Sequence, residues 1–168
     1  LDYSETLLRR KLQDIPDGKW YAEDYLDHDG LTEAVYVTRL WLQKKGDELI
    51  FDFRQSDNQA PGFINCPYAG LEGGVFNSVF PLLCNDIPWN SGILRPFRIL
   101  GREGALNYAK FPAAVSSGVV NASRSVANAT NAALAKMLSC SEKYRDNLMA
   151  VWSGSVFPAA TTTNMPAL

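Results

Sequence analysis

Residues 62–84 read GFINCPYAGLEGGVFNSVFPLLC, and the expected fold is built outward from this stretch. Its apolar residues recur at helical spacing, at Leu71, Val75, Val79 and Leu82 or Leu83. This spacing predicts a helix over residues 69–84. The glycines within it lower helix propensity but permit close packing, so the helix is predicted to be buried against a neighbouring element. Loops rich in Gly, Pro and Asn flank the helix, and such loops often carry functional groups.

Upstream of this helix, apolar and polar residues alternate in three segments, which is the pattern of β-strands. The predicted strands span residues 19–25, 33–44 and 48–53. Lys-Gly-Asp at residues 45–47 is a tight connection, so the second and third strands are predicted to form a hairpin. With the first strand they make a three-stranded antiparallel meander. The amphipathic segment 6–12 before them is interpreted as the end of a helix.

Downstream, residues 95–100 are predicted to form another strand, and the Ala-rich segment 119–138 is predicted to form a long helix. Ser116 or Ser117 is expected to cap this helix, although a Ser/Gly loop that leads into a helix is also an anion-binding geometry. One face of the helix is expected to hold Val119, Val126, Thr130, Ala133 and Met137, and its polar positions are Asn121, Arg124, Asn128 and Asn131. Residues 152–157 are a further strand candidate.

The order of these elements, an antiparallel sheet, a helix, a strand and a long helix, predicts an α+β fold. The antiparallel sheet is expected to pack with a buried helix and the long Ala-rich helix. Residues 1–138 are expected to form the core domain, as a fragment of a longer protein. Residues 139–168 are expected to be a C-terminal segment cut from its continuation, and the missing initiator Met supports the expectation of a fragment.

The composition is that of an ordinary globular domain, with 46% hydrophobic residues, 20% charged residues and a formal net charge of -2. Lys and Arg are dispersed along the chain, which argues against nucleic acid as a partner. No apolar run approaches the roughly 18 residues that span a bilayer, and the first residues lack the basic and apolar regions of a signal peptide. The three cysteines are far apart in the sequence and show no paired spacing for zinc, so they are expected to be reduced thiols. These features predict a cytoplasmic protein that binds neither nucleic acid nor a membrane.

The single histidine, His28, lies in an acidic cluster with Glu23, Asp24, Asp27 and Asp29, and Asp27, His28 and Asp29 are its candidate site residues. Carboxylates and imidazole are common metal ligands and proton carriers, so the cluster is a candidate for a metal or general-base site. The alternative is a solvated turn, because Asp and Gly favour turns and the spacing matches no zinc or calcium pattern. The sequence therefore predicts no metal site in this chain.

Four further candidates lie in the loops on either side of the central helix. Asn65, Asn90 and Arg95 are candidates for substrate binding, because carboxamides donate and accept hydrogen bonds and a guanidinium pairs with a carboxylate, a phosphate or a polarised carbonyl. The alternative is that these side chains hold the loop backbone in place. Cys66 is a candidate nucleophile only in a cationic or helix N-terminal setting, and a buried, inert thiol is the alternative.

Five short motifs follow one another along the chain. They read PDG at 16–18 with ED at 23–24 and DHDG at 27–30, FDF at 51–53, GFINCP at 62–67, DIPWNSGILRP at 86–96, and PAAV at 112–115. Their order resembles the hydantoinase B family, the subunit class shared by N-methylhydantoinase, 5-oxoprolinase and the acetone-type carboxylases. The resemblance covers residues 5–138. It departs from the family at residues 117–125, where a GGN-x-E-T-S-Q-R motif is replaced by SGVVNASRS and Asn121 stands in place of the acidic residue.

The resemblance implies a B-type subunit of an ATP-dependent hydrolase of cyclic amides, which acts on an intermediate activated by its partner. ATP with Mg would be bound by that partner, a hydantoinase A-type subunit, within a hetero-oligomer. Any divalent metal would be bound outside this fragment, and the fragment alone would be inactive. Two alternatives stay open: the B-type subunit of an ATP-dependent ketone carboxylase, and a non-catalytic assembly domain.

Overall fold

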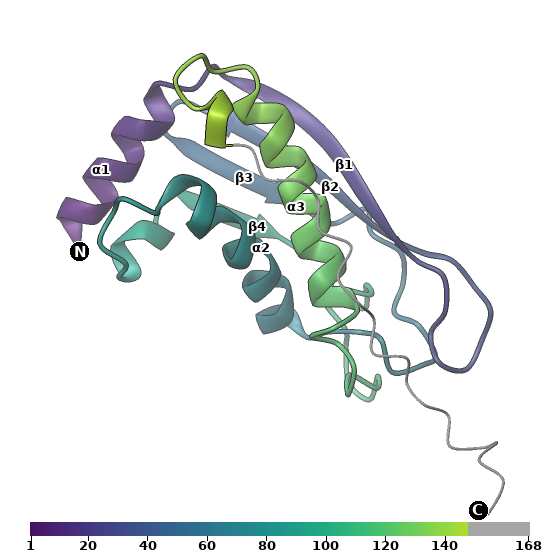
Figure 1. Ribbon diagram of the computed structural model, residues 1–168. Helices are drawn as coiled ribbons and strands as arrows, with labels where there is room; N and C mark the ends of the chain where they lie inside the picture. The colour runs from purple at the N-terminus through teal and green to yellow at the C-terminus, as the bar shows by residue number, and fades with distance from the viewer. Residues whose placement is uncertain (148–168) are drawn as a thin grey trace, which may run out of the picture.

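The computed structural model describes residues 1–147 and contains three α-helices and four strands (Figure 1). The helices are α1 (Asp2–Gln13), α2 (Tyr68–Leu83) and α3 (Ala122–Leu138), and the strands are β1 (Gly18–Leu26), β2 (Tyr36–Lys45), β3 (Glu48–Asp52) and β4 (Phe97–Leu100). Two short 3-10 helices, η1 (Ser91–Leu94) and η2 (Arg145–Asn147), complete it. The strand predicted at 152–157 lies outside the described residues, and so does most of the predicted C-terminal segment.

The four strands form one sheet in the order β1-β2-β3-β4. The first three run antiparallel, with Tyr21 opposite Trp41 and Leu42 opposite Phe51, so the predicted meander is confirmed. β4 pairs parallel to β3, with Ile99 opposite Phe51, so the strand predicted at 95–100 adds a parallel edge to the antiparallel meander. The connection from β3 to β4 contains α2, and a crossover of this length allows two strands to run in the same direction. The predicted α+β class is confirmed.

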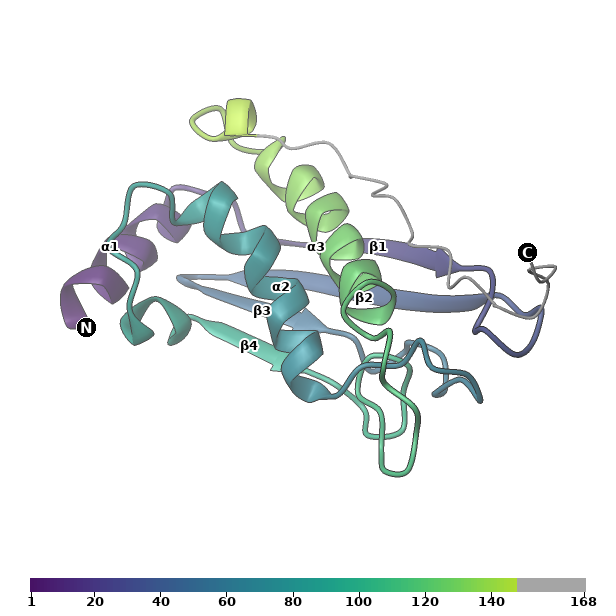
Figure 2. The ribbon, with the colours of Figure 1, turned by 60° about the horizontal axis from the view of Figure 1, so that its bottom comes forward.

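The hydrophobic core lies between the sheet and the helices α2 and α3, which cover the same face of it (Figure 2). Alternate residues of the strands and every third or fourth residue of the helices point into this core, as their periodicities require. The fully buried members include Leu40, Leu42, Leu49 and Phe51 from the sheet, Leu71, Val75 and Val79 from α2, and Val126, Leu134 and Met137 from α3. The predicted burial of the central helix is therefore confirmed.

α2 and α3 pack closely through small residues. A Cβ atom built at Gly74 would lie 2.5 Å from the main-chain oxygen of Ser123 on α3. One turn further along α2, the Ser78 hydroxyl donates a hydrogen bond of 3.0 Å to the carbonyl of Ala127. Small side chains at these positions let the two helix backbones approach, as the glycine content of the segment predicted.

α3 begins at Ala122, and Asn121 takes the N-cap position without a side-chain capping bond. The prediction that Ser116 or Ser117 caps the helix is therefore wrong. The loop before the helix is held in turns instead, since the Ser117 amide donates to the carbonyl of Phe63 at 3.1 Å. Val119 precedes the helix and is 81% exposed, whereas the other four residues of the predicted face are buried.

α1 is longer than the segment predicted for it and packs beside the sheet. Its Leu8 and Leu12 are fully buried in the same core. Acidic residues in its first turn and basic residues in its last turn suit the helix dipole. None of the helices in residues 1–147 is long and apolar enough to cross a membrane.

Candidate functional site

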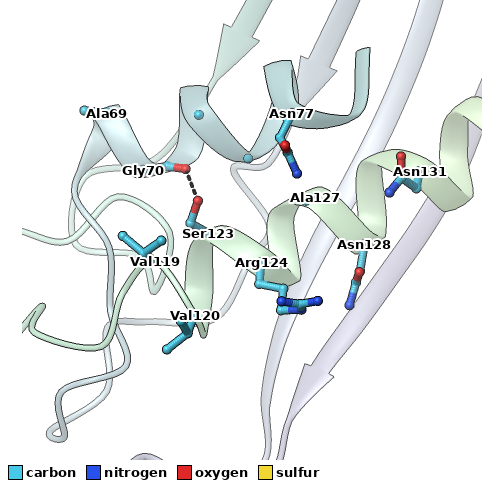
Figure 3. A pocket seen from close by; sticks show the side chains of 12 residues that line it. Ala69, Gly70, Asn77, Val119, Val120, Ser123, Arg124, Ala127, Asn128 and Asn131 are labelled. Carbon is cyan, nitrogen blue, oxygen red and sulfur yellow. Dashed lines mark hydrogen bonds between the residues drawn. The ribbon is translucent and has the colours of Figure 1, made fainter. Parts of the chain in front are cut away.

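A pocket of about 820 Å³ lies between α2 and the N-terminal part of α3 (Figure 3). This volume falls in the range of small-molecule binding sites. Its walls are formed by small or apolar residues, namely Ala69, Gly70, Gly73, Gly74, Val119, Val120 and Ala127. Its polar side chains are Asn77, Ser123, Arg124, Asn128 and Asn131. An apolar lining with a few convergent polar groups is typical of a ligand site.

The wall formed by α2 leaves open space in front of Gly73. A Cβ atom built there would meet no atom within 4 Å, so no contact among the described residues requires glycine at this position. Packing does explain the two neighbouring glycines, because a Cβ would lie 2.8 Å from the Cys66 Cβ at Gly70 and 2.5 Å from the Ser123 oxygen at Gly74. Glycine inside a helix costs about 0.5–1 kcal/mol relative to alanine. Gly73 therefore lowers helix stability without a packing reason.

The wall formed by α3 carries Arg124, Asn128 and Asn131, which lie three or four residues apart and so on one side of the helix. Asn131 is 5% exposed, and its Oδ1 accepts no hydrogen bond from the described residues. Buried side-chain oxygens are nearly always paired. The Asn131 oxygen is thus an acceptor at the pocket wall that a bound molecule could satisfy.

Asp24 on β1 holds the carboxamide of Asn128, whose Nδ2 donates to Asp24 Oδ1 at 3.4 Å. Burial raises the pKa of the Asp24 carboxyl, while its hydrogen bonds and the positive charge of Arg124 act in the opposite direction. The charge of Arg124 is therefore accompanied by a partly buried carboxylate.

Sequence reasoning did not identify this pocket. Gly73 is expected from the sequence only to permit close packing, which the open space at this position contradicts, and the polar residues of α3 are predicted only as polar positions of a helix. A signal was present, since Ala69, Gly73 and Asn77 are spaced by four residues and so share one face of α2. Which face of α3 lies opposite them depends on how the two helices cross, and a helical periodicity does not contain that information.

Asn65 lies beside the start of α2 with its side chain completely buried. Its Oδ1 accepts from the amide of Ala60 at 2.6 Å, and its Nδ2 lies within hydrogen-bond distance of the carbonyls of Ala60, Gly62 and Ala114. The carboxamide therefore joins two loops that are distant in sequence. This geometry corresponds to the alternative in which Asn65 holds loop backbone.

Asn90 and Arg95 lie beyond the other end of α2. Asn90 accepts from the Gly92 amide at 2.9 Å and donates to the Ser4 hydroxyl at 2.7 Å, so it caps η1 and ties it to α1. Arg95 Nη1 donates to Asp2 at 2.8 Å and to Glu5 at 2.7 Å. The 16 residues of α2 span about 24 Å, so the fold does not bring Asn65 together with the other two. Their contact with a substrate stays a prediction.

Asp29 is fully buried and organises the loop around it. Its carboxylate accepts from the amides of Leu31 at 2.7 Å and Gly62 at 3.1 Å and from the Tyr36 hydroxyl at 2.9 Å. Burial alone would raise the pKa of this carboxyl, but the hydrogen bonds from Thr32, Leu31 and Tyr36 hold it well below its usual range. Asp29 is therefore an anion solvated by backbone and hydroxyl groups.

The other predicted residues lie outside the α2–α3 pocket. Cys66 is 1% exposed, and burial raises the pKa of its thiol to about 12, so it is protonated near neutral pH. Asp27 and His28 are exposed, and the His28 Nδ1 accepts from the Gly30 amide at 2.7 Å. The Asn121 carboxamide donates to the Ser117 hydroxyl at 2.6 Å. Residues 1–147 contain no group of three or more His, Cys, Asp or Glu side chains placed to hold a metal ion.

Two of the known proteins that are similar to this chain are named after a reaction. The B-type subunit of a putative D-/L-hydantoinase from Pseudomonas sp. strain NS671 is 27% identical over 82% of this chain. The 5-oxoprolinase of Saccharomyces cerevisiae is 29% identical over 71% of it. The chain spans 25% of the first relative and 9% of the second, so it corresponds to a part of each.

The fold is also found in the crystal structure of the ATP-dependent caprolactamase from Pseudomonas jessenii, with a TM-score of 0.66 and 24% identity. That match covers 81% of this chain and 24% of the caprolactamase chain. A family model described as hydantoinase B/oxoprolinase matches residues 1–164, which is nearly the whole sequence. The protein therefore belongs to the hydantoinase B/oxoprolinase family.

Proposed function

We propose that this chain is part of the B-type component of an ATP-dependent hydrolase of cyclic amides, in a cytoplasmic hetero-oligomer with an A-type partner. The observation that carries the proposal is the family match over residues 1–164. The two relatives named after a reaction, a hydantoinase component and a 5-oxoprolinase, have names that refer to cyclic amides.

The α2–α3 pocket supports this proposal chemically. Asn77, Asn128 and Asn131 bring carboxamides to a mostly apolar cavity, and a carboxamide pairs with the N–H and C=O groups of another amide. One wall contains Val119, Val120, Ser123 and Arg124, which belong to the segment 117–125, where this chain departs from the family motif.

Among the described residues that line this pocket there is no carboxylate, imidazole or thiol. A general base for hydrolysis would therefore come from outside this wall of the pocket, from the remaining protein or the partner. The sequence also lacks the Gly-x-x-x-x-Gly-Lys-Ser/Thr loop that binds nucleotide phosphates. The proposal assigns ATP and Mg to the A-type partner.

An activity assay with the full-length protein and its A-type partner tests the proposal. We expect ATP consumption that depends on a cyclic amide, when hydantoin, 5-oxoproline and caprolactam are compared. Turnover of a ketone with bicarbonate, without turnover of any cyclic amide, would move the protein to the carboxylase alternative. Normal assembly without turnover in either arm would favour the assembly-domain alternative.

The same assay tests the residues predicted from the sequence. The double variant Asn90→Ala and Arg95→Ala should lower kcat/KM if these side chains contact the substrate. Full activity with normal assembly would leave them the role seen in the structure, in which they hold η1 and α1 together.

A further inference from the structure

We propose that the ammonium group of Lys136 closes the outer edge of β1 to a further strand, so that the sheet does not extend into a second copy of the chain. β1 and β4 are the outer strands of the four-stranded sheet that residues 1–147 form. The edge of an outer strand presents N–H and C=O groups that can pair with another chain. The inference concerns how the protein assembles, and it does not depend on the proposed function.

The pairing register shows which main-chain groups of β1 point outward. The N–H and C=O groups of Val37 on β2 both bond to Asp57, which follows β3, so they face away from β1. Val37 lies opposite Tyr25, and Tyr25 therefore directs its own main-chain groups to the outer side of β1. Because successive residues of a strand alternate in this respect, the outward-facing residues of β1 are Lys19, Tyr21, Glu23 and Tyr25.

A side chain from α3, which lies across β1 and β2, occupies one of these outward groups (Figure 2). Lys136 Nζ donates to the Tyr21 carbonyl at 2.6 Å. Lys136 lies in the last turn of α3 and is exposed, so its ammonium group keeps contact with water while it covers this part of the edge. A strand that paired with β1 would need the Tyr21 carbonyl and would have to displace or bury the charge. Because burial of an unpaired ammonium group is strongly unfavourable, the contact disfavours such pairing.

The opposite edge of the sheet has a similar arrangement. In β4 the Leu100 carbonyl accepts from the Phe53 amide on the side of β3, so the Ile99 carbonyl points outward. The Tyr68 hydroxyl of α2 donates to this carbonyl at 3.4 Å. β4 is also only four residues long, whereas β1 has nine residues, so β1 offers the longer edge to another chain. The charged contact, from Lys136, is thus placed on the edge where pairing would extend furthest.

The first test removes the charge and measures self-association of the full chain by sedimentation over a range of concentrations. Lys136→Met keeps the apolar stem of the side chain without its ammonium group. We expect at least about tenfold tighter self-association than in the wild type, because a pairing strand no longer has to displace a charge. Lys136→Arg, which can still donate to the Tyr21 carbonyl, should behave as the wild type. Lys110→Met is the matched control, since Lys110 is an exposed loop residue and the same charge is lost.

The second test locates the association on β1. Glu23→Pro removes an outward N–H group that a pairing strand would use and that β2 does not use. In the Lys136→Met background this substitution should return self-association to the wild-type level. Hydrogen exchange gives a second measurement without proline: in associated Lys136→Met the Tyr21 and Glu23 amides should exchange more slowly than in the wild type. The urea midpoints of all variants, measured in parallel, separate association of the folded chain from loss of folding.

Three results would overturn the inference. The first is a folded Lys136→Met variant that self-associates no more than the wild type. The second is an equal increase for Lys110→Met, which would assign the effect to the lost charge in general and not to the edge of β1. The third is association of Lys136→Met with unchanged exchange of the Tyr21 and Glu23 amides, which would place the contact on another surface. None of these results bears on the hydrolase proposal, which is tested by turnover.

Discussion

Replacement of Asp29 by asparagine should destabilise the protein by about 3 kcal/mol at pH 7. The carboxylate is fully buried and accepts from the amides of Leu31 and Gly62 and from the Tyr36 hydroxyl. In Asp29→Asn one oxygen becomes an NH2 group, and it would face the N–H of Gly62 as donor against donor. A hydrogen bond to a charged group contributes about 1.5–3 kcal/mol, and a buried unpaired donor adds about 1–3 kcal/mol.

The pH dependence of this effect follows from the lowered pKa of Asp29. A carboxyl group with a folded pKa below its unfolded value of about 3.9 contributes stability that is complete above the unfolded pKa. That contribution is lost as the pH falls toward the folded pKa, at about 1.4 kcal/mol per unit. The difference between the wild type and Asp29→Asn should therefore shrink by about 1 kcal/mol at pH 3.

Urea denaturation at pH 7 and pH 3, followed by tryptophan fluorescence, measures both quantities. Asp27→Asn is the matched control, because Asp27 is exposed and lies two residues away. Its free energy of unfolding should stay within about 0.5 kcal/mol of the wild type. An Asp29→Asn variant as stable as the wild type at pH 7, or a difference that does not shrink on acidification, would refute the reasoning.

Three further predictions concern the cysteines Cys66 and Cys140, Asn65, and Arg95. Cys140 is exposed and should react with a thiol reagent at neutral pH, whereas Cys66, buried and with its pKa raised to about 12, should react only after unfolding. Asn65→Ala should lower the free energy of unfolding by about 2–3 kcal/mol, because it leaves the buried Ala60 amide unpaired. A loss of unfolding free energy smaller than that caused by an Asn→Ala substitution at an exposed position would contradict this. Arg95→Ala should shift the urea midpoint far less than Asn65→Ala, since its ion pairs are exposed, and a shift of equal size would contradict this.

The sequence alone determined the kinds of elements and their order. Alternation in 33–44 and 48–53 and the glycine at position 46 predicted the hairpin, because a strand with one buried face requires a period of two. The helical spacing of 69–84 fixed α2 and its buried face, since Leu71, Val75 and Val79 can share a side only in a helix. The order of the motifs was also sufficient to identify the family, because it can be read along the chain without knowledge of the three-dimensional structure.

Only the tertiary structure decided where side chains meet and what they do. The direction of β4, the start of α3 at Ala122 and the separation of Asn65 from Arg95 all depend on how the connections pack. The pocket depends on the crossing of α2 and α3, which brings the Ser123 hydroxyl to the carbonyl of Gly70 although the two residues are 53 positions apart. Periodicity shows which face of a helix is buried, but which residues of two helices face each other is set by their contact in space.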